Sequence, residues 1–255
     1  MNLCHSSAMS TKRVLVTGSS RGIGRAIALR LATDGWQVAI HFNEHRGDAT
    51  KVASLLGEKS GGVYEANLSE VLHAAKLVER VCKDGPLHAV VNNAGVYLTM
   101  DFAGATDEAF KTAYNRCMTV NFESPAWIVR AACKHFLENG GGKVVNVCSR
   151  VGHRGEPGAA FYSASKAALL NLTRALAVEH ASKNIQHFAI APGWVETAMA
   201  RDGMGDRLPE ILAGIPLGRM ATPEDCAAAV SFLLREETSY LSGNVIDING
   251  ASYIR

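Results

Sequence analysis

The stretch Val14-Leu-Val-Thr-Gly18-Ser-Ser-Arg-Gly22-Ile-Gly24-Arg-Ala-Ile-Ala28 decides the fold of this chain. A short apolar run ends in a glycine-rich turn, and an alanine- and isoleucine-rich stretch with helical spacing follows. Glycine accepts the tight turn and lets the main chain approach a pyrophosphate, and a helix N-terminus offers unpaired N–H groups to it. The stretch therefore predicts a strand, a phosphate-binding turn and a helix. Its Gly-x-x-x-Gly-x-Gly spacing differs from the commoner Gly-x-Gly-x-x-Gly fingerprint, so by itself it also suits a structural loop.

The rest of the chain repeats this alternation of apolar runs and helical patterns, which is typical of a parallel sheet covered on both faces. Strands are expected at 13–17, 36–42, 62–66, 87–91, 143–148, 185–191 and 244–248. Helices are expected at 23–34, 47–57, 69–83, 107–138 with a break near Met118, 160–182 and 223–235. We therefore predict a single α/β domain with a Rossmann-type, doubly wound parallel sheet of about seven strands over residues 11–255.

Residues 194–222 are the irregular part of that domain. They mix Gly, Met and Pro with short helical patches, and they follow the C-terminal end of a strand. Ligands of open α/β sheets bind at such ends, so we expect a mobile lid here.

Composition limits the classes of function. The chain has 255 residues with 47% hydrophobic and 20% charged residues, which suits one globular domain. Its net charge of +2 comes from interspersed charges, so no nucleic-acid partner is expected. No apolar stretch reaches the ~18 residues of a membrane span. Six cysteines without C-x-x-C pairing indicate reduced thiols and a cytoplasmic location, or an organellar matrix. Residues 1–10 lack the apolar core of a signal peptide and are expected to form a flexible extension.

Tyr162 and Lys166 are four residues apart on one predicted helix, with Ser149 thirteen residues before Tyr162. A phenol titrates near ~10, and an ammonium group beside it lowers that pKa. The pair can therefore transfer a proton, as the interconversion of a ketone and an alcohol requires. Ser149 can donate a hydrogen bond to the oxygen where charge develops. Alone, the pair could be a packed tyrosine beside a solvated lysine, so the assignment depends on the other motifs.

The nine histidines do not form a metal motif. No His-Glu-x-x-His or similar ligand spacing occurs, and His41 and His45 straddle a predicted strand end. No metal site is predicted. His153, four residues after Ser149, is interpreted as a surface histidine, with a place in the substrate pocket as the alternative.

Together these motifs resemble the short-chain dehydrogenase/reductase family in order and spacing, from residue 12 to about 250. The matching residues are Thr17–Gly24, Asn92–Gly95, Asn121, Ser149, Tyr162, Lys166, Pro192, Gly193 and Thr197. Within the family, the segments Ile215–Glu224 and Leu241–Gly250 look most like those of 3-oxoacyl-(acyl-carrier-protein) reductases.

The resemblance implies an oxidoreductase that uses NADP(H) and transfers hydride to a carbonyl carbon. Ser149 and Tyr162 would bind the carbonyl oxygen, Tyr162 would donate the proton, and Lys166 would also bind the nicotinamide ribose. Asn121 would help to hold a water that links Lys166 to solvent. The backbone of Val195 and the hydroxyl of Thr197 would anchor the nicotinamide carboxamide. The full implied cofactor set is Gly18, Ser20, Arg21, Gly22, Ile23, Gly24, Asn43, Asn67, Leu68, Asn93, Ala94, Gly95, Tyr162, Lys166, Pro192, Gly193, Val195 and Thr197.

Two positions depart from the family pattern. Asn67 stands where many relatives have an aspartate that contacts the adenine amino group, and an amide can make a similar contact. Phe188 replaces a small polar residue.

The end of the predicted second strand favours NADPH over NADH. NAD-specific folds place an acid there for the ribose 2′-hydroxyl, but Val38-Ala-Ile-His-Phe-Asn43 contains none before Glu44. Arg21 is expected to meet a 2′-phosphate, and Asn43, His45 and Arg46 are candidates to assist it. If the strand ended later than predicted, Glu44 would lie near the ribose and would instead favour NADH.

The expected substrate is a 3-oxoacyl thioester, with an acyl carrier protein as a candidate partner. Carrier proteins are acidic, so such an enzyme needs basic residues near the pocket mouth. Lys183 matches one basic position of related reductases, Gly140 stands at the other, and Lys143 or Lys134 are candidate substitutes.

The sequence also allows other functions and predicts an oligomeric assembly. An NADP-dependent reductase or dehydrogenase of a small ketone, sugar or quinone is the alternative, with Arg150 and Arg154 as binding groups for an acidic substrate. A non-catalytic dinucleotide sensor is a remote alternative, because the catalytic set is intact. A homotetramer is expected, because helices 107–138 and 160–182 carry more apolar residues than one sheet face needs and because relatives pair through them.

Overall fold

The computed structural model describes residues 11–255, so the expected extension at residues 1–10 lies outside the described part. Seven parallel strands form one sheet in the order β3-β2-β1-β4-β5-β6-β7. The strands are β1 Arg13–Val16, β2 Gln37–Phe42, β3 Ser60–Glu65, β4 Ala89–Asn92, β5 Gly142–Val147, β6 Ile185–Pro192 and β7 Val245–Ile248. The prediction of a single doubly wound α/β domain is confirmed, and the strand order reverses between β1 and β4.

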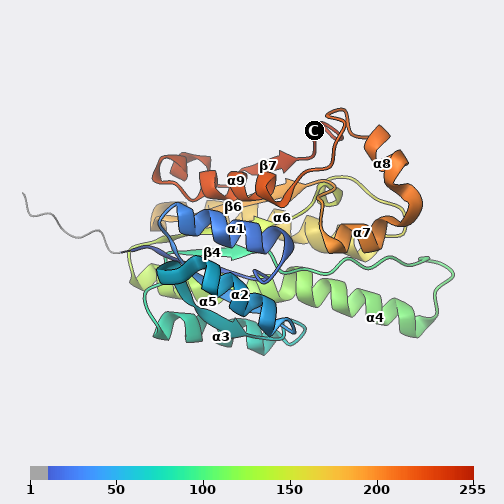
Figure 1. The fold of residues 1–255 in the computed structure, drawn as a ribbon. Coiled ribbons are helices and arrows are strands. Elements are labelled where there is room, and N and C mark those ends of the chain that lie inside the picture. Colours follow the sequence, from blue (N-terminus) through green and yellow to red (C-terminus); the bar gives the residue numbers. More distant parts are fainter. Residues whose placement is uncertain (1–10) are drawn as a thin grey trace, which may run out of the picture.

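Helices cover both faces of the sheet (Figure 1). They are α1 Gly22–Thr33, α2 Arg46–Leu56, α3 Val71–Lys83, α4 Asp107–Met118, α5 Ser124–Glu138, α6 Ala160–His180, α7 Ala198–Met204, α8 Leu208–Ala213 and α9 Pro223–Leu233. Apolar residues of α1, α2 and α9 share one core with Val14 and Val16, whereas those of α3 and α5 share the other with Leu15. Alternate residues of β1 thus serve opposite cores, which explains the unbroken apolar run in its sequence.

The break that the sequence predicts near Met118 is a π turn over Thr119–Glu123, between α4 and α5. Such turns insert one extra residue into a helix and often occur at functional sites. Several element ends differ from the expected ones by one or two residues: β3 begins at Ser60, β4 at Ala89 and α3 at Val71. Apolar periodicity marks the middle of an element better than its ends.

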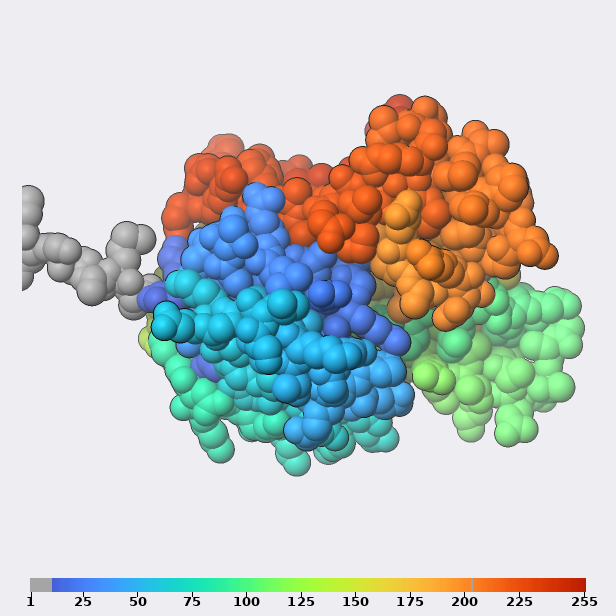
Figure 2. All heavy atoms as spheres, in the orientation of Figure 1, coloured from blue at the N-terminus to red at the C-terminus, as the bar shows by residue number. Residues whose placement is uncertain are grey.

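The expected lid, residues 194–222, contains α7, α8 and a small apolar cluster of its own. Met204, Ile211, Ile215 and Met220 form this cluster. Figure 2 shows the segment in orange, next to the blue N-terminal layer and above the green segment around α4.

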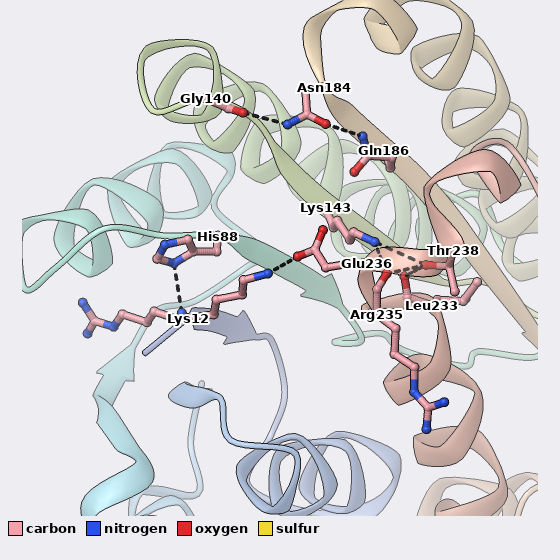
Figure 3. A network of polar contacts seen from close by, with 11 residues as sticks. Lys12, His88, Gly140, Lys143, Asn184, Gln186, Leu233, Arg235, Glu236 and Thr238 are labelled. Carbon is pink, nitrogen blue, oxygen red and sulfur yellow. Dashed lines mark hydrogen bonds and ion pairs between the residues drawn. The ribbon is translucent and has the colours of Figure 1, made fainter. Parts of the chain in front are cut away.

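A polar network ties the amino ends of β1 and β5 to the segment that follows α9 (Figure 3). Lys12 forms an ion pair with Glu236, and the Lys143 Nζ donates to the carbonyl oxygen of Arg235 and to Thr238 Oγ1, the latter at 3.2 Å. Lys143 is buried, and burial lowers its pKa. The network lies at the end of the sheet opposite to the strand ends that carry the predicted site.

None of the helices within 11–255 has the length and apolar character needed to cross a membrane. The five cysteines in the described residues, all except Cys4, are free thiols.

Candidate active site

The glycine-rich turn lies at the carboxyl end of β1, at the point where the strand order reverses. A Cβ on Gly24 would lie 2.3 Å from the Gly18 oxygen and 2.4 Å from Asn93 Nδ2, so only glycine fits there. Gly18 and Gly22 have φ angles of 63° and 54°, in the region that favours glycine. The N-cap of α1, Arg21, makes no side-chain capping bond, so the first N–H groups of the helix stay available. This cradle suits the pyrophosphate of a dinucleotide.

The end of β4 is held against the same turn. Thr17 Oγ1 accepts hydrogen bonds from the main-chain N of Asn93 at 2.9 Å and of Ala94 at 3.0 Å. Asn93 Nδ2 donates to the main-chain carbonyl oxygen of Thr17 at 2.9 Å. The predicted residues Asn93 and Ala94 therefore lie beside the glycine turn. Thr17 was not among the predicted cofactor residues, and a hydroxyl just before the first glycine was the available signal.

His41, inside β2, braces the turn from the other side. Its Nδ1 accepts from the Gly18 N–H at 2.9 Å, and its Nε2 lies 3.0 Å from the Ala66 oxygen. Its main-chain N–H donates to Ser19 Oγ at 3.0 Å. Burial lowers the pKa of His41 to about 4, so the ring is neutral near pH 7. The proton then sits on Nε2 and is donated to Ala66. From the sequence, His41 is interpreted only in connection with a metal site, which is not predicted. A histidine in an otherwise apolar strand is nevertheless a signal of a buried polar contact.

The predicted catalytic residues come together above the ends of β5 and β6. Ser149 follows β5 and caps the short turn Arg150–Gly152, where its Oγ accepts from the Val151 N–H at 3.4 Å. Tyr162 and Lys166 lie in the first turns of α6. The Lys166 Nζ lies 5.8 Å from the centre of the Tyr162 ring and donates to the Val147 oxygen at 2.8 Å.

The surroundings of Tyr162 favour its protonated form. Burial raises the pKa of Tyr162, and a hydrogen bond with Ser149 only partly offsets this. The Lys166 ammonium group donates to Val147, and burial lowers the pKa of Lys166. Because burial disfavours the charged phenolate, the phenol keeps its proton in this arrangement. The expected lowering of the Tyr162 pKa by Lys166 stays a prediction.

Asn121 occupies the π turn between α4 and α5 and is fully buried. Its Oδ1 accepts from the Val96 N–H at 2.8 Å, and its Nδ2 donates to Ser165 Oγ at 3.1 Å. Ser165 Oγ in turn donates to the main-chain carbonyl oxygen of Tyr162 at 2.7 Å, one helical turn earlier in α6. Asn121 thus joins the loop after β4 to the catalytic helix. Ser165 had not been predicted.

Gly95 lies beside these groups, because a Cβ there would be 3.1 Å from Asn121 Oδ1 and 3.5 Å from the Lys166 Nζ. A side chain at this position would therefore press on Asn121, and glycine leaves the loop after β4 room beside Lys166.

The start of the lid forms the facing wall. Pro192 ends β6, and the Gly193 N–H donates to the Ile248 oxygen at 2.9 Å. Thr197 caps α7, where its Oγ1 accepts from the Ala200 N–H at 3.2 Å. A Cβ on Gly22 would lie 3.5 Å from Thr197 Cγ2, so the N-termini of α1 and α7 face each other. Val195, buried, pairs with Ala221 in an isolated bridge.

The remaining predicted cofactor residues lie at the glycine turn and start of α1 and just after β2 and β3. Arg21 is exposed and forms no ion pair with any residue in 11–255. Asn43 Nδ2 donates to Glu44 Oε1 at 3.2 Å, and Asn67 Oδ1 accepts from the Ser69 N–H at 2.9 Å. The other members of the set are Ser20, Ile23 and Leu68, of which Ser20 and Leu68 are buried.

A second tyrosine lies against the catalytic one. The rings of Tyr97 and Tyr162 meet edge to face with centroids 4.9 Å apart, and the Tyr97 hydroxyl donates to Glu156 Oε1 at 3.1 Å. Burial and Glu156 raise the pKa of Tyr97 to about 12. Glu156 also lies 3.6 Å from the Arg150 guanidinium. This carboxylate balances the positive charge of Arg150, which is expected from the sequence to bind an acidic substrate. Neither Tyr97 nor Glu156 had been predicted.

His153 is not the surface histidine that was expected. Its side chain is 9% exposed, stacks on Tyr253 and has Nε2 at 3.7 Å from Asp247 Oδ1. The fold of the C-terminal segment over this loop covers the ring, and sequence spacing contained no sign of that contact.

Fold and site together define a Rossmann-type protein in which Tyr162 and Lys166 lie above the strand ends, beside a glycine turn that suits a pyrophosphate. The family model described as Enoyl-(Acyl carrier protein) reductase matches residues 18–251. The acetoacetyl-CoA reductase of Allochromatium vinosum is 34% identical over 94% of this chain and 98% of its own length. The 3-oxoacyl-(acyl-carrier-protein) reductase of Chlamydia muridarum is 34% identical over 96% and 98%.

Among solved structures, a blue fluorescent protein from a metagenomic library in complex with NADPH is 30% identical, with a TM-score of 0.86 over 95% of this chain and 98% of that one. The chain belongs to the short-chain dehydrogenase/reductase family. It is therefore an oxidoreductase that interconverts CH–OH and C=O groups.

Proposed function

We propose that the protein reduces the 3-oxo group of an acyl thioester with NADPH. The observation that carries the proposal is the convergence of Ser149, Tyr162 and Lys166 beside a glycine turn shaped for a pyrophosphate. The names of the relatives from Allochromatium vinosum and Chlamydia muridarum support the thioester class.

Each residue has a definable task in this reaction. When bound, NADPH supplies the hydride. The Ser149 and Tyr162 hydroxyls hold the carbonyl oxygen, and the Tyr162 phenol, kept protonated by burial, gives its proton to that oxygen. Asn121 and Ser165 fix the first turns of α6, so the phenol keeps its position. Lys166, the nearest ammonium group to the phenol, assists reprotonation.

The cofactor is NADP(H). Arg21 lies at the N-cap of α1 with its guanidinium uncommitted, whereas Arg46 is already paired with Glu65 at 2.6 Å. A guanidinium binds a phosphate by charge-assisted hydrogen bonds.

We expect Arg21→Ala to reduce kcat/KM for NADPH at least tenfold and to change that for NADH little. Steady-state rates with both cofactors check this, with Arg46→Ala as the matched control. Equal loss with both cofactors would contradict the assignment.

The carrier-protein partner belongs to the same proposal, with one change in its basic residues. Lys143 is buried and bound to Arg235 and Thr238 at the far end of the sheet, so the expectation that it substitutes for Gly140 is wrong. Lys134 and Lys183 are exposed and remain the candidates for docking an acidic carrier.

A substrate panel tests the thioester proposal. Acetoacetyl-CoA, an acetoacetyl carrier-protein thioester and simple ketones are assayed with NADPH at low and moderate salt. We expect activity on both thioesters, and a preference for the protein-bound one that weakens as salt screens the encounter. Activity on ketones with none on either thioester would overturn the proposal.

A reductase of small polar carbonyl compounds is the second candidate. Tyr97 and Glu156 place a phenol and a carboxylate beside Tyr162, and Arg154 is exposed near them. Such groups suit a hydroxylated or acidic substrate, and the same panel distinguishes it when sugars and quinones are included.

For the assembly we propose a homotetramer in the cytoplasm. Phe102 and Tyr114 leave aromatic surface exposed around α4, and Val178 of α6 is 82% exposed beside the start of β7. Two separate apolar surfaces on one chain suit two kinds of two-fold contact.

A further inference from the structure

Three potential metal ligands converge in a place that the reaction does not use. Cys133 of α5, His180 of α6 and His187 of β6 are all buried, and their ligand atoms lie within 4.8 Å of one another. Cys133 Sγ lies 3.7 Å from His180 Nδ1, which lies 3.0 Å from His187 Nε2. His187 is five residues before Pro192, so the cluster is about 16 Å along β6 from the active-site end.

The Cys133–His180 and His180–His187 separations are close to those around a tetrahedral zinc ion, and all three ligand atoms lie within 4.8 Å of one another. With bonds of about 2.0–2.1 Å to nitrogen and about 2.3 Å to sulfur, tetrahedral ligands lie about 3.3–3.6 Å apart. Small ring movements would therefore bring the three atoms onto one ion.

Hydrogen bonds among the three side chains cannot satisfy all of their polar atoms at once. His180 Nδ1 faces both the Cys133 thiol and His187 Nε2. A neutral imidazole nitrogen has either one lone pair or one proton in the ring plane, so it cannot serve both partners well. A cation would instead accept a lone pair from all three atoms.

The surrounding charges also suit a divalent cation. His180 Nε2 lies 3.4 Å from Glu179 Oε1, the arrangement in which a carboxylate orients a metal-bound imidazole. A Cys133 thiolate and the Glu179 carboxylate together would balance a charge of +2. The bound cation would make the thiol release its proton to solvent, with no change of oxidation state.

We propose that Cys133, His180 and His187 bind a zinc-class divalent cation that ties α5 and α6 to β6. One thiolate and two imidazoles favour Zn²⁺ over the hard cations Mg²⁺ and Ca²⁺, which prefer oxygen ligands. The ion has a structural role, and a water or other small ligand takes its fourth position.

The test uses untagged full-length protein, reduced and stripped of metal by a chelator. Co²⁺ is titrated as a spectroscopic probe, followed by Zn²⁺ in competition. We expect one Co²⁺ per chain with an intense thiolate-to-cobalt band in the near ultraviolet, loss of that band when Zn²⁺ is added, and a higher Tm with Zn²⁺.

Variants locate the site. Cys133→Ser should remove the band and weaken Co²⁺ binding at least tenfold, while Cys226→Ser, which changes another buried thiol, should behave like wild type. If Cys133→Ser does not fold, the exposed Glu179→Gln should weaken binding about 10–100-fold. A folded wild-type protein that gives no band and no Zn²⁺-dependent rise in Tm would overturn the proposal. So would a band that survives in folded Cys133→Ser.

Discussion

At the scale of single residues, the proposed role of Tyr162 in the chemistry can be tested separately from that of His41, which holds the glycine turn. Tyr162→Phe removes one hydroxyl from the catalytic group and leaves the ring packing against Tyr97. We expect turnover to fall by about 10²–10⁴-fold, the usual contribution of a general acid, with NADPH binding unchanged. Rates of NADPH oxidation and fluorescence titration of NADPH check this, and wild-type turnover would refute the assignment.

His41 makes stability depend on pH in a definite window. Its folded pKa of about 4 is below the ordinary value of 6.5, so the unfolded chain takes up a proton first as pH falls. The free energy of unfolding therefore decreases from about pH 6.5 down to about pH 4, by roughly 1 kcal/mol between pH 7.5 and 5.5.

His41→Val should remove this part of the pH dependence, lower stability at pH 7.5 and weaken NADPH binding. The losses follow because Gly18 N–H and the Ala66 oxygen lose their buried partner. Denaturant unfolding at both pH values and NADPH titration are the measurements, with His73→Ala on the exposed face of α3 as control. An unchanged pH dependence in His41→Val would show that other groups cause it.

At the scale of elements, the turn between β1 and α1 must approach β4 closely. Gly24→Ala puts a methyl group 2.3 Å from the Gly18 oxygen, so the turn must open. We expect at least a tenfold weaker NADPH affinity and a stability loss of about 1–3 kcal/mol. Gly47→Ala is the matched control, because nothing lies within 4 Å of a Cβ there and α2 should gain up to about 1 kcal/mol. Calorimetry on both variants measures the stability and the NADPH affinity. A Gly24→Ala protein as stable as the Gly47→Ala protein, with the same NADPH affinity, would contradict the prediction.

The elements also separate what the sequence could predict from what it could not. Short apolar runs between helical stretches indicated every strand of the sheet, because both signals are local. The break near Met118 was visible too, yet its π geometry depends on how Asn121 bonds to Val96 and Ser165 across the fold.

Contacts between distant segments left no local signal. The candidate catalytic residues could be named from the sequence because Tyr162 and Lys166 are four apart on one helix and because the surrounding motifs resemble those of the family. The meeting of Cys133, His180 and His187 depends on the packing of α5 against α6 and β6, and the burial of Lys143 depends on the segment after α9. Neither the meeting of the three ligands nor the burial of Lys143 can be predicted from the spacing of residues in the sequence.

At the scale of the whole molecule, the exposed surface of α6 next to β7 should be a subunit contact. Val178→Glu places a charge beside Ala177 and Ala181 on this surface and should reduce the proposed tetramer to a dimer, because burying a charge in a subunit contact is costly even beside Arg174. Light scattering at micromolar concentration measures the mass. Leu55→Glu on α2, where Leu55 is 61% exposed, is the control and should remain tetrameric. A wild-type protein that is a stable monomer would contradict the proposed assembly.

The network of Lys12, Lys143, Glu236 and Thr238 affects how the molecule opens. It ties the amino ends of β1 and β5 to the segment after α9, whereas at the other end residues 194–222 pack mainly on a small cluster of their own. Local opening is easiest where few buried contacts must break, so solvent deuterium should reach the amides of 194–222 long before those of β1 and β5. The sheet can then admit a cofactor at one end while the other end remains closed to exchange.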